Sequence, residues 1–483
     1  MVKASPFAGY DAGRNYCEIL GLADTHSPPN SVNPLAKRLS NYKIRTLNQR
    51  NSAAERELHN LGITFTVYSD AGAIDRILPF DPIPRQIPQA DWKKIDRGCK
   101  QRVKALNAFL SDIYGKQKIL KDGVIPRALV AGNKNFRKEM LGVKLPHNTY
   151  THISGVDLIR NEKGQFLVLE DNCRSPSGVS YVIENRHLMM RSFPDLMEGV
   201  KIEPVSDYGM RLREKLTETV PGRYQNPRIV LLTPGVFNSA YFEHVFLARE
   251  MGVPLVEGRD LIVDDEDRVY MKTISGLERV HMIYRRIDDE FLDPEVFRKD
   301  SMLGVPGVMR SLNAGKVAIA NAVGAGVADD KAVYAYVPRI IKYYLDEEPI
   351  LDNVETYICR EKDDLAYVLD HLEELVVKPV GESGGYGIVV GPKASKAELA
   401  AIRRAVKKNP KNYIAQPMIQ LSVCPTLTKN GLRARHVDLR PFVLTGAEPW
   451  VLPGGLTRVA MREGSIIVNS SQGGGSKDTW VLR

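Results

Sequence analysis

A strand followed by a glycine-rich loop offers a plausible site for a phosphate group. The segment 375–390 begins with apolar residues ending at Lys378, continues through a loop with Gly384, Gly385 and Gly387, and returns in an apolar stretch. Glycines let the backbone approach an anion closely and direct several N–H groups at it. A lysine adds a positive charge suited to phosphate. The pattern indicates a phosphate site, and a plain hairpin with a glycine-rich turn is the alternative.

A second group of polar residues lies at the end of another predicted strand. Residues two positions apart on a strand share a face, so Glu170 and Asn172 point together while Asp171 points away. Carboxylate and amide oxygens are the hard ligands that Mg²⁺ prefers. Asp157, on the preceding strand of a predicted hairpin, would add a third oxygen. The alternative is a polar strand end that runs into a turn, where Asp and Asn are common.

The elements that must position these residues are both helices and strands. A helix is predicted to start near Asp91, because apolar residues recur at helical spacing from Ile95 to Ile113. Strands at about 150–160 and 165–170 form the predicted hairpin. Residues 1–90 are predicted to hold loops, one helical piece and a strand near their end.

The region 228–300 has a different character. A short buried strand at 228–233, a helix at about 239–250 and a strand at 253–257 predict a βαβ unit with a parallel sheet. The region 375–450 alternates strands with short helices. The predicted class is therefore α/β or α+β.

The composition limits the classes of protein to which this chain can belong. The chain has 483 residues and a net charge of +9, with 43% hydrophobic and 26% charged residues, which is typical of a globular protein and excludes disorder. Lysine and arginine never form a block of five or six, so we expect anionic small molecules rather than nucleic acid as partners. We see neither an apolar run long enough to cross a membrane nor a secretory signal. Five scattered cysteines favour a reducing cytoplasm.

Taken together, these segments resemble the circularly permuted ATP-grasp ligases, which include eukaryotic-type glutathione synthetase and glutathionylspermidine synthetase. They are more closely similar to bacterial circularly permuted ATP-grasp type 2 proteins, often labelled as glutathionylspermidine synthases. The resemblance covers most of the chain. The matching strings are Gly98–Arg102, Asp112–Tyr114, Leu169–Gly178, Thr233–His244, Tyr284–Asp289, Ala328–Lys331, the Lys378 loop and Asn469–Gly475.

The resemblance implies roles for single residues. Glu170 and Asn172 match the family's Glu-x-Asn magnesium pair, and Asp157 matches the aspartate on the strand before it. Lys378 with Glu382 matches a Lys-x-x-x-Glu motif in which the lysine holds nucleotide phosphate and the glutamate binds metal.

The resemblance also implies roles for residues outside these two segments. Lys331 matches the earlier ATP-grasp lysine, and Gln416 falls near the hinge strand that meets adenine. Arg440 resembles the arginine aimed at the reacting phosphate, and Arg458 is a second candidate. Gly155 departs from the pattern, because glutathionylspermidine synthetase has an arginine there, so the arginine must come from elsewhere.

The implied fold is a circularly permuted ATP-grasp fold with an inserted, Rossmann-like pre-ATP-grasp substrate domain. We expect an N-terminal extension at 1–90, the first ATP-grasp part with the metal-binding hairpin at 91–225, the substrate domain at 226–310, and the nucleotide-binding part at 311–483.

The substrate domain holds two candidate sites for a carboxylate. Asn238 and Ser239 open a predicted helix whose N-terminus would attract an anion. Arg285 and Arg286 would clamp a carboxylate, and a structural pair bonded to an aspartate just after them is the alternative.

The implied activity is an ATP- and Mg²⁺-dependent carboxylate–amine ligase that works through an acyl phosphate. Its substrates would be amino acids or peptide-like compounds, as in glutathionylspermidine synthases, and the loop 381–387 would be a lid. Two alternatives stay open: a non-catalytic nucleotide-binding partner protein and a phosphotransferase. The sequence does not fix the oligomeric state.

Overall fold

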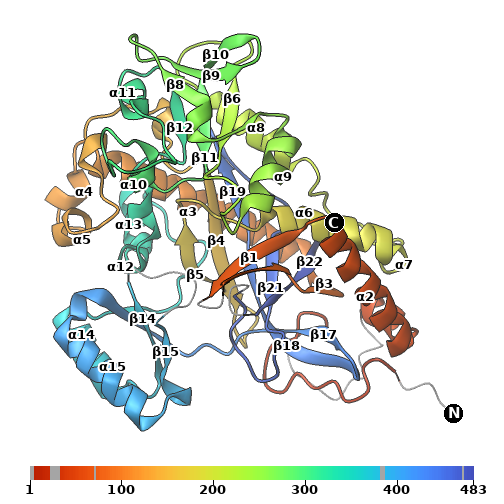
Figure 1. The fold of residues 1–483 in the computed structure, drawn as a ribbon. Coiled ribbons are helices and arrows are strands. Elements are labelled where there is room, and N and C mark those ends of the chain that lie inside the picture. Colours follow the sequence, from red (N-terminus) through yellow and green to blue (C-terminus); the bar gives the residue numbers. More distant parts are fainter. Residues whose placement is uncertain (1–4, 22–32, 70–71, 381–386, 470–472) are drawn as a thin grey trace.

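The computed structural model describes residues 5–21, 33–69, 72–380, 387–469 and 473–483. Within these ranges the largest sheet has nine strands, in the order β20-β19-β4-β18-β21-β22-β3, with β5 beside β4 and β17 beside β18 (Figure 1). The strands are β3 Phe80–Ile87, β4 Ile153–Arg160, β5 Phe166–Asn172, β17 Val423–Thr428, β18 Gly431–Arg440, β19 Phe442–Thr445, β20 Pro449–Val451, β21 Leu456–Val459 and β22 Gly475–Val481.

This sheet interleaves strands from distant parts of the chain. Strand β4 pairs with β5 in the predicted hairpin, which is confirmed, and also with β18 and β19 from the C-terminal part. The outer strand β3 pairs in parallel with β22. Its prolines, Pro82 and Pro84, are tolerated because an edge strand can spare backbone donors. The mixed α/β class predicted from the sequence is confirmed.

The long helix α3, Gln89–Ile113, covers this sheet on one side. Its predicted apolar stripe is confirmed, because Ile95, Leu106, Phe109 and Ile113 are all fully buried. It packs against α13, Val337–Leu345, and against the strands β19 and β20.

The N-terminal part is more ordered than the sequence indicated. It forms α1, Pro34–Ser40, and α2, Ile44–Asn60, followed by a hairpin of β1, Thr64–Ser69, and β2, Gly72–Ile77. Helix α1 is capped by Asn33, whose side chain accepts from two backbone N–H groups. These elements lie near α6, Val179–Ser192, and α7, Pro194–Met197 (Figure 1).

The predicted βαβ unit is confirmed as part of a four-stranded parallel sheet of order β12-β11-β6-β7. Strand β12 lies beyond residue 310, so the sheet extends past the range expected for the substrate domain. Three antiparallel strands, β8 to β10, project from this unit at the top of Figure 1. The elements are β6 Ile229–Leu232, α8 Tyr208–Glu218, α9 Tyr241–Met251, β7 Leu255–Val256, β8 Leu261–Val263, β9 Val269–Thr273, β10 Gly276–Val280, β11 Met282–Arg285, α10 Asp289–Leu292, α11 Val308–Asn313 and β12 Ala318–Ala320.

A small subdomain, defined here as residues 357–417, forms a separate lobe at the lower left of Figure 1. Its antiparallel sheet has the order β13-β16-β14-β15 and packs on two helices through a core that includes Val368, Val377 and Val406. The elements are β13 Tyr357–Ile358, α14 Lys362–Asp370, β14 Leu375–Pro379, β15 Val389–Val390, α15 Lys396–Lys408 and β16 Tyr413–Pro417. Short helices α4, Lys118–Lys121, α5, Arg127–Ala131, and α12, Lys331–Ala335, lie elsewhere. No helix in the described ranges is both long and apolar enough to span a membrane.

A buried ion pair fixes the strand that carries two predicted metal ligands. Asp171 on β5 points away from the site, as predicted, and accepts from Arg102 of α3 at 2.6 and 2.8 Å. Both side chains are almost fully buried. Arg102 also donates to Asn353 Oδ1 at 2.8 Å. This pair holds β5, and with it Glu170 and Asn172, against the long helix.

Replacing Arg102 by methionine is expected to lower the free energy of unfolding by about 3–5 kcal/mol, because it leaves the Asp171 carboxylate buried without its partner. Urea unfolding followed by tryptophan fluorescence measures the loss. The matched control is Lys100→Met on the same helix, whose ion pair with Asp96 is partly exposed and should be worth less than about 1 kcal/mol. Equal losses in the two variants would contradict the structural role of Arg102.

Candidate active site

The three predicted metal ligands share one face of the β4–β5 hairpin. The register places Asp157 opposite Glu170, and Gly155 opposite Asn172. The Asn172 amide nitrogen lies 3.4 Å from Asp157 Oδ1 and donates to the Gly155 carbonyl at 3.3 Å. Two carboxylates and an amide therefore gather over two residue pairs, which is a donor set of the kind that suits Mg²⁺.

Two arginines hold the Asp157 carboxylate. Arg440 on β18 binds it through both Nε, at 2.5 Å, and Nη2, at 2.8 Å, and Arg458 on β21 donates to Oδ2 at 2.7 Å. Burial opposes ionisation of Asp157, but the two guanidinium groups outweigh it and hold its pKa below its usual range. Burial and the charge of Asp157 together raise the pKa of Glu170.

This arrangement bears on the predicted metal role of Asp157. Both of its carboxylate oxygens accept from arginine, so a metal ion there would share them or require an arginine to turn away. Within the described residues no group of three His, Cys, Asp or Glu side chains is placed to hold a metal ion. The predicted set instead combines carboxylates with the amide of Asn172, and its fourth member, Glu382, lies outside the described residues.

Asp438 belongs to the same cluster and was not predicted as a site residue. It lies two residues before Arg440 on β18, and both of its oxygens accept from Arg458 Nε, at 2.9 and 3.0 Å. Burial raises the pKa of its carboxyl group. The signal that could have found it is strand alternation, since residues 438 and 440 share a face.

Gly155 lies beneath the Arg440 side chain. A Cβ atom at Gly155 would be 3.0 Å from Arg440 Cδ and 3.2 Å from Pro176 Cβ, closer than such atoms usually approach. Arg440 therefore occupies the space above the position where glutathionylspermidine synthetase carries its own arginine. This placement agrees with the expectation that the arginine comes from another part of the chain.

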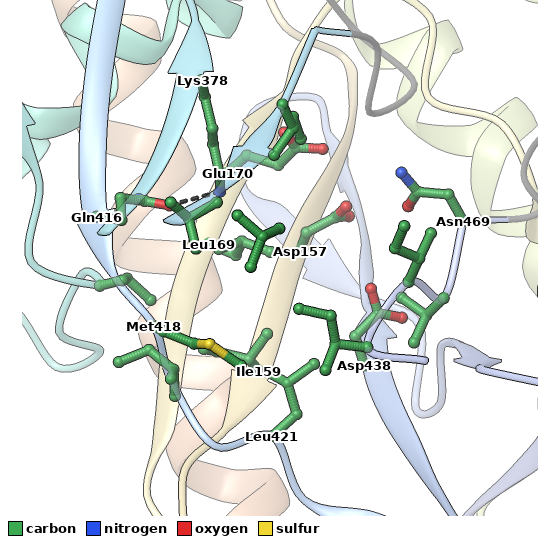
Figure 2. A pocket seen from close by; sticks show the side chains of 18 of the residues that line it. Asp157, Ile159, Leu169, Glu170, Lys378, Gln416, Met418, Leu421, Asp438 and Asn469 are labelled. Atoms are coloured by element: carbon green, nitrogen blue, oxygen red, sulfur yellow. Dashed lines mark hydrogen bonds between the residues drawn. The ribbon is translucent and has the colours of Figure 1, made fainter. Parts of the chain in front are cut away.

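A cavity of about 300 Å³ opens beside this cluster, between the small subdomain and the nine-stranded sheet (Figure 2). Asp157, Glu170, Asp438, Lys378 and Arg458 give it a charged side. Most of its other walls are aliphatic, and they include Ile159, Leu169, Val376, Met418, Leu421 and Ile467. A cavity with apolar walls and a concentrated charged side suits a flat base joined to a polyphosphate.

Two lysines and a glutamine complete the charged side. Lys378 on β14 donates to Gln416 Oε1 on the neighbouring β16 at 2.5 Å, and Gln416 in turn donates to Thr356 at 2.9 Å (Figure 2). Lys331, the first residue of α12, lines the same cavity. Burial, and then the charge of Lys331, lower the pKa of Lys378 to about 8, although Glu170 acts in the opposite direction. These lysines would be stabilised by a bound polyanion.

Comparison with known proteins agrees with this geometry. The model of the circularly permuted ATP-grasp type 2 family matches residues 84–460. The chain belongs to this family. It is an ATP-grasp ligase of the carboxylate–amine class.

Relatives of this ATP-grasp ligase occur in several bacteria. An uncharacterized Synechocystis protein is 52% identical over 475 residues, which cover 98% of each chain. An uncharacterized Mycobacterium tuberculosis protein is 53% identical over 437 residues, covering 90% of this chain and 78% of the relative. A Frankia casuarinae protein named "Putative glutamate–cysteine ligase 2-2" is 43% identical over 438 residues. That match covers 90% of this chain and 50% of the Frankia protein, so this chain spans half of that relative.

A solved structure supports the fold. A glutathione synthetase-like effector from Globodera pallida, in its apo form, superposes with a TM-score of 0.59 over 91% of this chain and 98% of the effector. The sequences are 10% identical, so this likeness shows the fold alone. The circularly permuted ATP-grasp fold predicted from the sequence is confirmed.

The ligase's predicted carboxylate clamp is engaged within the protein. Arg285 donates to Asp289 Oδ1 at 2.5 Å and to carbonyls of residues 287 and 321. Arg286 is buried against Glu243, Tyr284 and Ser177. These contacts favour a structural role, although Arg285 alone pairs with an aspartate and Arg286 pairs with Glu243. The Ser177 carbonyl accepts from Arg440 Nη1 at 3.3 Å, so Arg286 supports the loop beneath the catalytic candidate.

The other predicted residues divide into two groups. Asn238 and Ser239 lie in a turn, because α9 begins at Tyr241, and the Asn238 side chain accepts from the Ala240 N–H. Neither residue lines the cavity described above. Gly384 and Gly385 lie outside the described residues, like Glu382.

Gly387 is the described end of the glycine-rich loop. Its φ of +70° is left-handed, and a Cβ there would lie 2.9 Å from Pro379 Cγ. Glycine is therefore needed where the chain returns from the loop toward β15.

Because a charged lysine attracts phosphate and a neutral one does not, the affinity of the wild-type protein for ATP should fall roughly tenfold from pH 7 to pH 9. The lowered pKa of Lys378, about 8 in the free protein, is the cause. Titration with a fluorescent ATP analogue at each pH measures the effect. Lys378→Arg keeps its charge across this range and should flatten the decline. An equally steep decline in that variant would contradict this assignment.

Gly155→Ala is expected to lower ligase turnover, because the new methyl group would lie 3.0 Å from Arg440 Cδ and shift that side chain. The affinity for ATP should change little, since Gly155 does not line the nucleotide cavity. Steady-state ADP release measures turnover. Full activity in Gly155→Ala would show that the position of Arg440 does not matter.

Proposed function

We propose that this protein joins a carboxylate to an amine, with ATP and Mg²⁺, through an acyl phosphate. The observation that carries the proposal is the meeting of Lys331, Lys378 and Arg458 with Asp157 and Glu170 at one side of an otherwise largely aliphatic cavity. These residues come from four separate parts of the chain. Their arrangement supports the binding of a nucleotide whose phosphates point toward the acidic face.

In the proposed first step, a substrate carboxylate oxygen attacks the γ-phosphorus of ATP, and ADP leaves. Lys331 and Lys378, which line the cavity, would hold phosphate oxygens. Arg440, which binds Asp157 beside the cavity, would stabilise charge on the transferred group. Arg440 and Arg458 are already ordered by Asp157, so little reorganisation would accompany the reaction. In the second step an amine attacks the acyl carbon, phosphate leaves, and an amide forms.

The residues present fit Mg²⁺. Glu170 and Asn172 would hold it, with Asp157 beside them and Glu382 as a further predicted ligand. The ion would supply neutralisation of phosphate charge. Burial and the charge of Asp157 raise the pKa of Glu170, and a cation placed there would favour its ionised form.

The proposed substrates are amino acids or short peptides. This part rests on the names of relatives, since one is named as a glutamate–cysteine ligase and a structural neighbour is described as glutathione synthetase-like. A reaction of the glutathionylspermidine synthase type, which joins a peptide carboxylate to a polyamine, is the finer form of the proposal. We place the protein in the cytoplasm, because its five cysteines are buried free thiols.

Hydroxylamine, as a surrogate amine, tests the ligation. With ATP, Mg²⁺ and a pool of amino acids and dipeptides, the wild-type protein should form hydroxamates and release ADP. Lys378→Ala should lose roughly a hundredfold in turnover, together with the rise in melting temperature that ATP produces. The matched control is Lys407→Ala, an exposed lysine of the same subdomain, which should behave like the wild type.

Other outcomes of the hydroxylamine experiment would favour one of the alternative functions or contradict all of them. ATP-dependent stabilisation without phosphate release or hydroxamate would favour a non-catalytic nucleotide-binding protein. Phosphorylated product without hydroxamate would favour a phosphotransferase. If ATP does not stabilise the wild-type protein, the ligase, the nucleotide-binding protein and the phosphotransferase are all contradicted.

A further inference from the structure

A second cavity lies directly beyond the nucleotide cavity. Its volume is about 340 Å³, and Glu170 and Lys331 line both cavities. One wall comes from the small subdomain, through Arg360, Lys411 and neighbouring residues, and the other comes from the remainder of the chain. A molecule in this cavity would therefore reach the side of Glu170 and Lys331 where the proposed phosphate transfer takes place.

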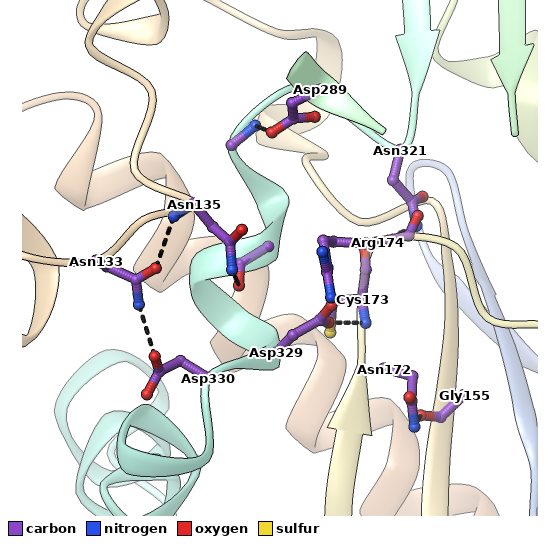
Figure 3. A network of polar contacts seen from close by, with 12 residues as sticks. Asn133, Asn135, Gly155, Asn172, Cys173, Arg174, Asp289, Asn321, Asp329 and Asp330 are labelled. Carbon is purple, nitrogen blue, oxygen red and sulfur yellow. Dashed lines mark hydrogen bonds and ion pairs between the residues drawn. The ribbon is translucent and has the colours of Figure 1, made fainter. Parts of the chain in front are cut away.

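Three of the acidic groups of this cavity, Asp171, Asp329 and Asp330, already have partners. Asp329 accepts from Arg174 Nε at 2.6 Å and from the Cys173 N–H, and Asp330 accepts from Asn133 at 2.9 Å (Figure 3). Asp330 also caps α12 by accepting from two of its N–H groups. Asp171 is held by Arg102. These three carboxylates are therefore poorly suited to bind a cation. The asparagines beside them are engaged as well, since Asn133 donates to Asp330 and Asn135 donates to the Gly326 carbonyl at 3.1 Å (Figure 3).

Arg360 on the opposite wall is in a different situation. It follows β13 and precedes α14, and its Nε atom is buried with no hydrogen-bond partner among the described residues. No ion pair of its guanidinium is found within the described ranges either. Leaving a buried, charged donor without an acceptor is costly, so such groups in native proteins call for an explanation. Arg360 also lines the second cavity, where a ligand carboxylate would offer acceptors to the rest of its guanidinium.

We propose that this cavity binds a small dicarboxylic amino acid, with Arg360 holding its side-chain carboxylate while the α-carboxylate reacts. The inference rests on the proposed function and names its carboxylate substrate. Glu170 and Lys331 mark the reacting end, because they line both cavities, whereas Arg360 lines only the second. A substrate that reaches from Arg360 to the reacting end needs one carboxylate at each of these two positions. The guanidinium would bind its carboxylate through paired N–H donors.

Binding of L-glutamate and L-aspartate tests the proposal, with L-glutamine and L-asparagine as neutral probes of the same shape. Calorimetry is done on the full chain saturated with a non-hydrolysable ATP analogue and Mg²⁺. At least one acid should bind the wild-type protein, and its amide should bind more weakly by roughly tenfold or more. Arg360→Gln should remove this preference, and Arg360→Lys should restore part of it. Affinity for the ATP analogue should stay unchanged in both variants.

One variant serves as the control, and three results would overturn the inference. Arg403→Gln removes the same charge from the exposed face of α15 and should leave acid binding intact. Failure of both acids to bind, equal binding of acid and amide, or unchanged acid binding in Arg360→Gln would each overturn the inference. If the ATP analogue itself does not bind the wild-type protein, the proposed function fails instead, and the inference with it.

Discussion

The buried contact of Asp157 with Arg440 and Arg458 joins strands from the two halves of the chain. Asp157 lies on β4, from the first half of the chain, and the arginines lie on β18 and β21, from the C-terminal part. Asp438 binds Arg458 and extends the network. Burying these charges is costly, and mutual pairing offsets the cost only while every member is present. The network therefore fixes the register at the centre of the sheet and orders both arginines.

The same contact determines the electrostatics of the site. With Asp157 kept ionised by its arginines, the neighbouring Glu170 ionises less easily, and its pKa is raised. Across the cavity, burial and Lys331 lower the pKa of Lys378. A bound Mg²⁺ would favour the ionised form of Glu170, and a nucleotide polyphosphate would favour the charged form of Lys378. Gly155 contributes to the position of Arg440, because a side chain at residue 155 would crowd this arginine.

The placement of the small subdomain explains why the two cavities adjoin. Its strands β14 and β16 bring Lys378 and Gln416 to the nucleotide cavity, whereas its loops bring Arg360 and Lys411 to the second cavity. Glu170 and Lys331, which line both, come from the rest of the chain. A movement of the subdomain would change both cavities together, which would couple nucleotide binding to binding of the acid in the proposed reaction.

Local patterns in the sequence determined the local elements. Two-residue alternation predicted that Glu170 and Asn172 share a face, helical spacing predicted α3, and long family strings predicted the permuted fold. Each of these patterns can be recognised from residues that are close together in the sequence. The partners of Arg285 and Arg286, the use of Asp438 and the covering of Gly155 by Arg440 were decided only by the tertiary structure. Each depends on side chains that are distant in sequence or on the register between strands, and no local pattern reports which strand will lie beside another.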